Sequence, residues 1–470
     1  MLKKAFMLVS GNAFGSALLL IRNLIVARML SPEDYGIAAT FAISMSIVEM
    51  MSYLGLQQLI VVDKDGDQPH VQAAMQGFQV LRGAISCALL FAIAHPYADF
   101  LGVEHVAWAY QLIALIPLVN GLQHFDQHRL KRRMNFRPSI IVGSVPAFIA
   151  VGALWPLALW LDDYRIMLAS LFVQYGAQVA LTHLMAERPY RLTWDTAIVK
   201  RSMKFGWPLL LNGIMLFGIF NGEKLIVGRE LGMAALAIFS MGFTLTLTPT
   251  LVLANSIQSF FLPQLTSSRD RPEHFQKVSA ATVEASLAVC VLLVLGTSLV
   301  GGPVAHLLLG QKYASILPIL VPLAVVQGVR VSKTGSSVVA LARHQSGNSI
   351  VANLFRIASL PFSWYIAVRT GDLLAIIWVA TLAEVLGFLT ALLLVRGRAG
   401  MKLRRVAVPV ALTMLTCGAA LFVADAYPSQ PRLIDQLHLP HLGVVLVALA
   451  ALASMVELRS YLTRKMLRRP

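Results

Sequence analysis

The sequence predicts an all-α, polytopic membrane protein of about 14 transmembrane helices, arranged as two pseudo-symmetric six-helix lobes plus two extra C-terminal helices. Three observations support this prediction: the composition, the regular succession of apolar segments, and an internal repeat. Of the 470 residues, 57% are hydrophobic and 13% are charged, and the mean hydropathy is +0.70. Because about 25% of the residues of a soluble globular domain are charged, this composition excludes that class.

Fourteen apolar segments are long enough to cross the hydrocarbon core of a bilayer, which takes about 20 residues per helix. The first is too long for a signal peptide, and no small-residue cleavage site precedes the second, so we expect it to be retained. The evidence is weakest for the fifth and sixth, which only a short turn at Asp162-Asp163 joins. The predicted spans are 6–30, 36–62, 75–95, 106–125, 139–160, 164–185, 205–229, 236–262, 278–300, 314–341, 348–367, 372–395, 406–424 and 441–459.

The basic residues gather in alternate loops, and this predicts the orientation in the membrane. With the N-terminus in the cytoplasm, the opposite side holds only Arg165, Arg229, Lys312, Arg369 and Arg432, plus Arg28 at a boundary. We therefore expect a multi-pass protein of the bacterial inner membrane with both termini cytoplasmic. The cytoplasmic loops explain most of the formal charge of +16, so no nucleic-acid partner is implied. The basic segment 188–204 is expected to lie as an amphipathic piece on the inner leaflet.

An internal repeat relates the first and seventh spans. The run Leu24 to Leu30 matches the run Leu225 to Leu231 at an offset of 201 residues, with arginine at the same place in both. Six spans separate the two copies, so both have the same orientation, as in transporters built from parallel repeats. The predicted domains are an N-terminal lobe 1–200, a C-terminal lobe 201–400, and a remainder 401–470 with two further helices and a basic tail. The paired Arg28 and Arg229 are expected to snorkel or to cap a helix end.

Charged residues inside the predicted spans are costly, so they are the candidate functional residues. Arg330 and Lys333 lie three apart on one helix face and cannot neutralise each other. They need acids or an anionic ligand, which makes them the first candidates for substrate binding; a structural ion pair between helices is the competing interpretation. The further candidate cations are Arg22, Arg82, Lys224 and Arg356, and the acids that could serve coupling or ion pairing are Glu49, Glu223, Glu284 and Glu384.

Other motifs favour no enzyme, cofactor or metal. His124 and His128 flank Asp126 at a metal-ligand spacing, but the adjoining bases from Arg129 to Arg133 would repel a cation. The three cysteines each lie in an apolar run, which indicates small buried residues and no metal set. No phosphate-binding loop or nucleophile elbow occurs. Polar stripes such as Asn12 with Asn23 are equally compatible with a wet cavity and with helix–helix bonding.

Several motifs resemble the polysaccharide-transporter family, the O-antigen and exopolysaccharide repeat-unit flippases of the multidrug/oligosaccharidyl-lipid/polysaccharide flippase superfamily. The resemblance reaches to about residue 396. It rests on Gly11-Asn12, Leu24 to Leu30, Ser31 to Gly36, Leu54-Gly55-Leu56, Arg133 to Arg137, Leu309 to Tyr313 and Pro318-Ile319-Leu320. It implies a V-shaped pair of six-helix lobes that enclose a central cavity. It also implies that an oligosaccharide on polyprenyl pyrophosphate moves from the inner to the outer leaflet.

The sequence therefore favours a flippase for a lipid-linked oligosaccharide that works by alternating access in the lipid bilayer. The glycosyltransferases and the polysaccharide polymerase of the same pathway would be its partners. A lipid II-type flippase stays open, because the resemblance associates fourteen spans with that group and twelve with many sugar-lipid flippases. A cation-coupled multidrug exporter is disfavoured, since cations outnumber acids in the spans. A membrane polysaccharide polymerase is disfavoured by the small external loops.

Overall fold

The computed structural model describes residues 2–51, 54–345, 347–436 and 438–467, with side chains from residue 14 onward apart from those of 51, 462 and 464–467. Over these ranges the chain is helical and contains no β-strand. This confirms the all-α, polytopic class. Packing divides the chain into two compact units, Met1–Ala237 and Ile238–Pro470. Packing is a different criterion from the sequence repeat, so the lobe borders near residues 200 and 400 stay a prediction.

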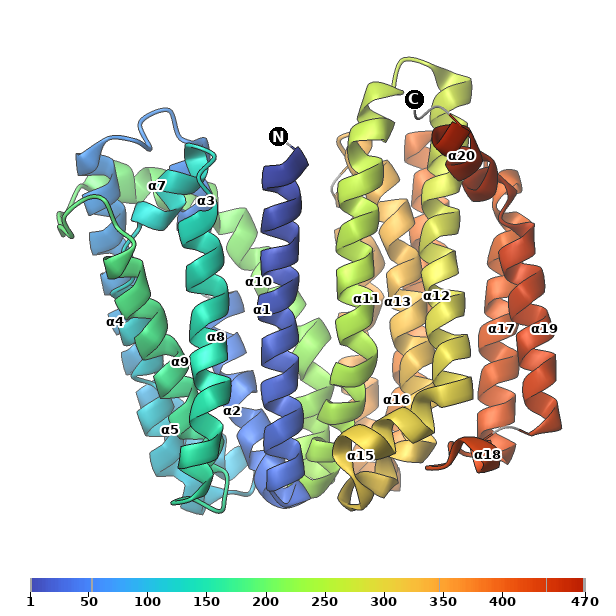
Figure 1. Ribbon diagram of the computed structural model, residues 1–470, viewed down its shortest axis with the longest axis horizontal. Helices are drawn as coiled ribbons and strands as arrows, with labels where there is room; N and C mark the ends of the chain where they lie inside the picture. The colour runs from blue at the N-terminus through green and yellow to red at the C-terminus, as the bar shows by residue number, and fades with distance from the viewer. Residues whose placement is uncertain (1, 52–53, 346, 437, 468–470) are drawn as a thin grey trace. The chain divides into compact units, whose positions relative to one another are not determined.

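The first unit consists of ten α-helices and one 3-10 helix within the described residues (Figure 1). Helix α8 packs against both α1 and α9, and α10 packs against α2 and α4. This arrangement surrounds the site described below. The helices are α1 (Leu2–Met29), α2 (Pro32–Met51), α3 (Leu56–Val62), α4 (Pro69–Phe100), η1 (Glu104–Val106), α5 (Ala107–Ile113), α6 (Ile116–Gly121), α7 (Asp126–Arg132), α8 (Arg137–Ala158), α9 (Arg165–Leu184) and α10 (Thr196–Glu230).

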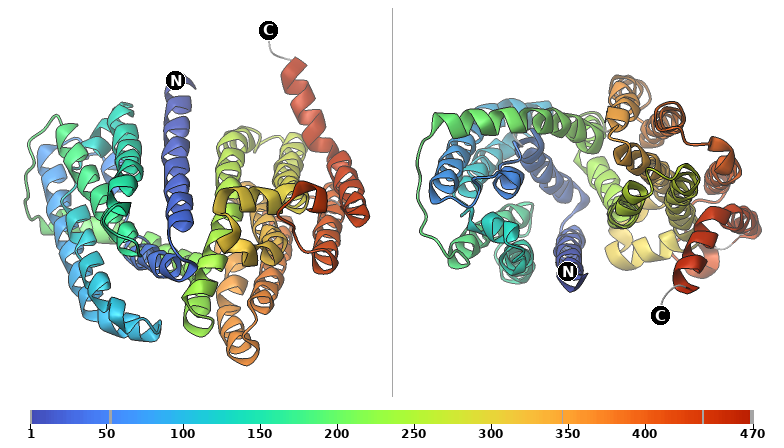
Figure 2. Two further views of the ribbon diagram at one scale, coloured as in Figure 1. Left: turned by 60° about the horizontal axis from the view of Figure 1, so that its bottom comes forward. Right: turned by 90° about the horizontal axis from the view of Figure 1, so that it is seen from above.

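The second unit is built around α12, which packs against α13, α17, α19 and α20. The last long helices, α17 and α19, lie side by side (Figure 2) and share an apolar core with α12. Helix α11 (Met233–Ser267) begins in the first unit and continues in the second. The other elements are α12 (Pro272–Leu309), η2 (Gln311–Ile316), α13 (Leu317–Ala342), α14 (Gly347–Ala358), α15 (Leu360–Thr370), α16 (Leu373–Ala399), η3 (Leu403–Arg405), α17 (Ala407–Ala426), α18 (Leu433–Gln436), α19 (Leu439–Ser454) and α20 (Val456–Leu467).

Each of the fourteen predicted spans falls on helical structure. Within the described residues, nine helices are long and apolar enough to cross a membrane, or ten if the bent pair Glu104–Gly121 and Asp126–Arg132 forms one span. The described helices are thus those of a multi-pass membrane protein. The number fourteen itself stays a prediction.

Four of the predicted spans are not continuous helices, which corrects the sequence prediction. The span 106–125 is interrupted between α5 and α6 and again between α6 and α7, and the span 441–459 is interrupted at Met455, between α19 and α20. The span 36–62 is interrupted between α2 and α3, where Gly55 has φ +62°, a left-handed conformation that glycine adopts without a steric penalty. The span 348–367 breaks between α14 and α15 at Ser359, directly before Leu360 and Pro361. Proline lacks a backbone N–H group, so it begins a helix more readily than it continues one.

The segment 188–204 is not one amphipathic piece. Its first part, up to Asp195, has no helical structure and runs along α4, where the Thr193 nitrogen donates to the Ala73 oxygen over 3.3 Å. The Gln76 side chain donates to the Arg191 carbonyl over 2.8 Å. The second part opens α10, because the Asp195 carboxylate accepts hydrogen bonds from Ala197 and Ile198 and so caps that helix. The mixed polar pattern of 188–204 therefore comes from two segments: a non-helical one that runs along α4, and the first turns of α10.

Candidate functional site

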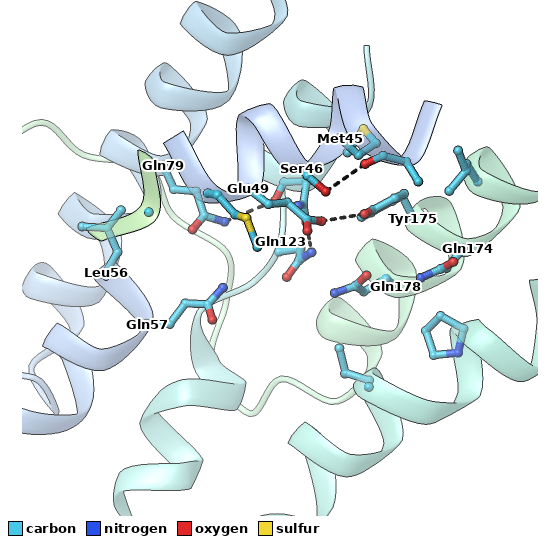
Figure 3. Close-up of a pocket in the computed structure, with 18 of the residues that line it drawn as sticks. Met45, Ser46, Glu49, Leu56, Gln57, Gln79, Gln123, Gln174, Tyr175 and Gln178 are labelled. Carbon is cyan, nitrogen blue, oxygen red and sulfur yellow. Dashed lines mark hydrogen bonds between the residues drawn. The ribbon is translucent and has the colours of Figure 1, made fainter. Parts of the chain in front are cut away.

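A polar cavity of about 750 Å³ lies inside the first unit (Figure 3). Its volume falls within the range of roughly 300–1,000 Å³ of small-molecule sites. Helices α1, α2, α3, α4, α6, α8, α9 and α10 all contribute residues to its lining. The polar side chains of the lining are Arg22, Ser46, Glu49, Gln57, Gln79, Arg82, Asn120, Gln123, Gln174, Tyr175, Gln178 and Asn212.

Two of the predicted cations, Arg22 and Arg82, belong to this lining. The Arg22 side chain is only 7% exposed, and its Nη1 atom donates a hydrogen bond to Oε1 of Gln174 on α9. The Nε atom of Arg22 has no hydrogen-bond partner within the described part of the chain. A buried guanidinium with an open donor is suited to bind an anionic or polar ligand, because leaving that donor unsatisfied costs free energy.

Glu49 is the one acid among the cavity-lining residues that the structure describes. Its Oε1 atom accepts a hydrogen bond from the Tyr175 hydroxyl over 2.7 Å, while the side chain remains accessible from the cavity (Figure 3). Tyr175 follows Gln174, the partner of Arg22, so the cation and the acid approach the same turn of α9. As far as the described side chains go, Glu49 and Arg22 form no ion pair with each other, and each is held by a neutral side chain.

The other polar groups of the cavity are mainly amides, seven in all: Gln57, Gln79, Asn120, Gln123, Gln174, Gln178 and Asn212. None of the five glutamines is among the candidates predicted from the sequence, which are all charged residues. A signal was present, because Gln174 and Gln178 lie four apart inside a predicted span and therefore share a helix face. Of the polar stripes considered from the sequence, Asn212 lines the cavity, Asn23 does not, and the side chain of Asn12 lies outside those described.

The second unit brings four further predicted residues together in one ion cluster. The Glu384 carboxylate is fully buried; its Oε1 atom lies 2.8 Å from Nε of Arg330 and 3.4 Å from Nε of Arg356, and its Oε2 atom lies 2.6 Å from Nζ of Lys333. Three cations thus share one carboxylate. Gln327 accepts a hydrogen bond from Arg330 over 3.0 Å, and Asn353 accepts one from Lys333 over 3.2 Å.

This cluster is separate from the cavity described in the second unit. That cavity measures about 360 Å³ and is lined by α11, α12 and Leu320 with mainly apolar side chains. Arg330, Lys333 and Arg356 are absent from its lining. The guanidinium of Arg330 instead lies over the ring of Phe243, at 5.6 Å from its centroid. Arg330 and Lys333, which the sequence ranked first, therefore contact one acid, two amides and an aromatic ring.

Three other candidates lie apart from both cavities. Glu223 is buried in α10, and Lys224 beside it is half-buried; neither belongs to the lining of the polar cavity. Glu284 on α12 is buried, and its Oε2 atom accepts a hydrogen bond from the Leu458 nitrogen over 2.6 Å. Because Leu458 is in the first turn of α20, Glu284 satisfies an N-terminal donor of that helix. The contact of Glu284 is therefore structural.

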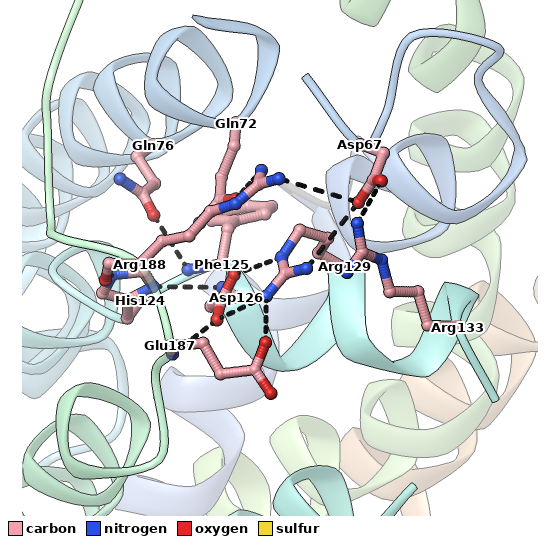
Figure 4. A network of polar contacts seen from close by, with 10 residues as sticks. All are labelled: Asp67, Gln72, Gln76, His124, Phe125, Asp126, Arg129, Arg133, Glu187 and Arg188. Atoms are coloured by element: carbon pink, nitrogen blue, oxygen red, sulfur yellow. Dashed lines mark hydrogen bonds and ion pairs between the residues drawn. The ribbon is translucent and has the colours of Figure 1, made fainter. Parts of the chain in front are cut away.

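His124 and Asp126 belong to a network of hydrogen bonds and ion pairs at α7 (Figure 4), whereas the ring of His128 packs against Phe125. The Asp126 carboxylate is buried and contacts Nε of Arg129 at 2.5 Å. Nδ1 of His124 accepts from the Asp126 nitrogen, so its Nε2 atom donates to the Arg188 carbonyl. Within the described residues no three histidine, cysteine or acidic side chains form a metal-binding group.

Asp67 connects the same network to the loop before α4 (Figure 4). Its carboxylate accepts a hydrogen bond from Arg133 over 2.5 Å and lies 3.7 Å from Arg129 and 3.8 Å from Arg188. The hydrogen bond from Arg133 lowers the pKa of Asp67, and the other arginines add to this effect. The basic run Arg129 to Arg133 is thus partly neutralised within the first unit.

Comparison with known proteins shows to which family this chain belongs. Residues 25–318 match the family model described as polysaccharide biosynthesis protein, which is more than half of the 470 residues. The chain belongs to the polysaccharide biosynthesis protein family. This confirms the family to which the opening motifs pointed.

Relatives of this family member carry names from the synthesis of bacterial polysaccharides. The chain is 28% identical over 317 residues to the succinoglycan biosynthesis transport protein ExoT of Rhizobium meliloti, a match that covers 65% of this chain and 62% of the relative. It is 20% identical over 336 residues to the lipopolysaccharide biosynthesis protein WzxC of Escherichia coli, covering 69% and 66%. The matches thus span about two thirds of the length of these relatives.

Solved structures show which fold the family member has. An inward-facing multidrug resistance MATE family transporter of the MOP superfamily superposes with a TM-score of 0.66 at 14% identity, over 82% of this chain and 95% of the other. The lipid II flippase MurJ in an inward closed conformation superposes with a TM-score of 0.69 at 12% identity, over 98% and 100%. The polysaccharide biosynthesis protein described here therefore shares the fold of these membrane transporters.

Proposed function

We propose that this protein is a flippase that moves a polyprenyl-pyrophosphate-linked oligosaccharide, the repeat unit of a surface polysaccharide or exopolysaccharide, across the bacterial inner membrane by alternating access. The observation that carries the proposal is the cavity of the first unit. It combines the cations Arg22 and Arg82 with seven amides inside a bundle of membrane-type helices. Such a substrate has an anionic part and a neutral, hydroxyl-rich part, and the cavity offers groups for both.

In this proposal the pyrophosphate binds to the arginines. Guanidinium groups donate paired hydrogen bonds that fit phosphate oxygens, and bonds between charged partners are the strong ones. Arg22 keeps one donor open toward such a partner. Its bond to Gln174 is to a neutral amide, which holds the side chain in place without cancelling its charge.

The cluster around Glu384 is proposed as a second, weaker candidate for binding the anion. Its three cations and one carboxylate leave two positive charges in excess among these four residues. Arg330 is the most accessible of them, with 13% of its side chain exposed. The rank of the candidates thus changes from the sequence analysis: Arg22 and Arg82 come first, then Arg330, Lys333 and Arg356. Lys224 stays a candidate from the sequence.

The proposal also places the protein in its pathway. Both termini are proposed to lie in the cytoplasm, following the distribution of lysine and arginine among the loops. Glycosyltransferases on the cytoplasmic side would supply the lipid-linked oligosaccharide, and a polysaccharide polymerase on the other side would consume it.

The alternative of a multidrug exporter fits the cavity less well. Cationic drugs need acidic side chains to bind them, and Glu49 is the one acid among the described lining residues.

The test reconstitutes the full-length protein in liposomes with lipid-linked oligosaccharides extracted from the source bacterium, and measures how fast they reach the opposite leaflet. Arg22→Gln and Arg82→Gln each remove a cation from the cavity. Bonds to a charged group contribute about 1.5–3 kcal/mol, so each variant should reduce the rate by about 10- to 100-fold. The matched control is Arg28→Gln, at an exposed position of α1 outside the cavity lining.

Two results would contradict the proposal. The wild-type protein could leave the leaflet distribution of the oligosaccharide lipid unchanged. Alternatively, both arginine variants could transport at the wild-type rate with normal amounts of folded protein. Efflux of cationic dyes that depends on Glu49 would favour the drug exporter, and formation of longer glycans by the purified protein would favour a polymerase. Transfer of lipid II but not of the oligosaccharide lipid would favour a lipid II-type flippase.

A further inference from the structure

Seven amide side chains in one cavity of a membrane-type helical bundle call for an explanation. Each amide group carries two donor hydrogens and an acceptor oxygen, and burying these without partners is costly. Four of the seven are used within the protein. Gln174 accepts from Arg22, Gln79 donates to the Asn120 carbonyl over 3.2 Å, and Gln123 donates to the Asn120 side chain.

The remaining three, Gln57, Gln178 and Asn212, make no hydrogen bond to the described protein. They come from three separate elements, α3, α9 and α10. Figure 3 shows Gln57 and Gln178 directing their amide groups into the same open space. Packing does not require amides here, since Gln57 and Asn212 are exposed to the cavity and Gln178 is half-exposed. Three neutral groups are thus available to a ligand.

Neutral amides fit hydroxyl groups better than they fit a diphosphate. A hydroxyl both donates and accepts, as an amide does, so each contact can be satisfied in either direction. A phosphate only accepts and carries charge, and charged donors such as Arg22 bind it more strongly. The cavity therefore contains two chemically different sets of groups: the arginines and the three open amides.

We propose that Gln57, Gln178 and Asn212 bind sugar hydroxyls of the transported substrate and so form a glycan subsite beside the arginines. This inference rests on the proposed function and names the part of the substrate that these residues contact. Tyr175 adds an aromatic ring to the same lining. In this arrangement the arginines bind a group that all polyprenyl pyrophosphates share, and the amides distinguish one oligosaccharide from another.

The experiment measures binding of two probes to the full-length protein in lipid nanodiscs. The first probe is the free oligosaccharide released by mild acid from the lipid-linked oligosaccharides of the source bacterium. The second is polyprenyl pyrophosphate without sugar. The test variant combines Gln57→Met, Gln178→Met and Asn212→Leu, which remove the amides at similar volume. The matched control is Gln58→Met, because Gln58 neighbours Gln57 on α3 but lies outside the cavity lining.

The triple variant should bind the free oligosaccharide at least tenfold more weakly than the wild type, and polyprenyl pyrophosphate within twofold of it. The variant with Arg22→Gln and Arg82→Gln should show the opposite pattern, and Gln58→Met should resemble the wild type in both. Thermal melting of each variant confirms that the protein is folded. A variant that does not fold is replaced by the single substitution Gln178→Met, for which a threefold loss of oligosaccharide binding is expected.

Several outcomes would overturn the glycan subsite. These are wild-type binding of the oligosaccharide by the triple variant, equal losses for both probes, and no oligosaccharide binding by the wild-type protein. The last outcome is distinguishable from failure of the proposed function. A wild-type protein that flips the oligosaccharide lipid without binding the free glycan refutes the subsite alone. A protein that binds the glycan without moving the lipid refutes the transport and leaves the subsite standing.

Discussion

The Nζ atom of Lys333 on α13 lies 2.6 Å from Oε2 of Glu384 on α16, in the buried ion cluster of the second unit. Arg330 and Arg356 contact the other oxygen of the same carboxylate. One acid therefore connects α13, α14 and α16. Removing one partner of a buried ion pair is far more costly than the net contribution of the pair, because the other charge is left buried.

Replacing this acid should strongly destabilise the second unit. Glu384→Gln keeps the shape of the side chain and removes the negative charge that Arg330, Lys333 and Arg356 share. Breaking a buried pair costs about 3–5 kcal/mol, so the variant should melt at a markedly lower temperature in detergent. Glu273→Gln, at an exposed position of α12, is the matched control and should melt like the wild type. Equal melting temperatures for Glu384→Gln and the wild type would show that the cluster does not depend on this charge.

The pairing of Lys333 with Glu384 was one of the two interpretations that the sequence left open. Spacing three apart placed Arg330 and Lys333 on one helix face, but it could not show which distant acid faces them. Glu384 lies 51 positions after Lys333, and only the packing of α13 against α16 brings the two together. The polar cavity was harder to foresee, since eight helices contribute to it and its amides carry no charge.

The internal repeat relates two segments of the sequence, but equivalent residues in the two copies make different contacts. Arg28 and Arg229 occupy the same place in the two copies, yet Arg28 is exposed. Arg229 donates to the Phe100 carbonyl over 2.8 Å and so satisfies the C-terminal end of α4. The sequence predicted a boundary or capping role for this arginine. It could not identify α4 as the helix that is capped, because that contact depends on how α10 packs in the first unit.

Acid should destabilise the first unit through His128. Burial lowers the pKa of this imidazole to about 3, whereas an unfolded chain has a histidine pKa of about 6.5. As the pH falls below about 6.5, the unfolded state takes up a proton that the folded state does not, so the free energy of unfolding decreases. One pKa unit corresponds to about 1.4 kcal/mol, which gives a loss of about 2 kcal/mol at pH 5.

The measurement compares melting temperatures between pH 7.5 and pH 5 for the wild type and His128→Gln. The variant should lose less stability on acidification than the wild type, because its side chain does not titrate. His105→Gln, at an exposed position, is the control and should keep the wild-type slope. An unchanged slope for His128→Gln would contradict a neutral imidazole at α7.

A methyl group at Gly36 should disturb the packing at the start of α2. A Cβ atom built there would lie 1.9 Å from the carbonyl oxygen of Met233, the first residue of α11. Because the obstacle is backbone, the helices must move, and overpacking of this kind costs about 1–3 kcal/mol. Gly36→Ala should therefore lower the melting temperature. Gly152→Ala is the control, since nothing lies within 4 Å of its added Cβ and a helical alanine is favoured by up to about 1 kcal/mol. If the two variants melted alike, the close approach of α2 to Met233 would be wrong.

Oxidation should join α12 to α17 through Cys290 and Cys417. Their Sγ atoms lie 3.7 Å apart and both side chains are buried, so a small shift brings them to the 2.03–2.05 Å of a disulfide. Treating the protein in membranes with copper phenanthroline and oxygen should form this bond and remove two of the three thiols. Mass spectrometry of proteolytic fragments identifies the linked peptides.

Cys87, on α4 in the first unit, is the internal control and should stay free. Cys417→Ser should abolish the link, since no other described thiol faces Cys290. Because Cys417 lies in the predicted thirteenth span, forming the link would establish that this helix packs against α12. A link between Cys290 and Cys87 instead would refute that packing.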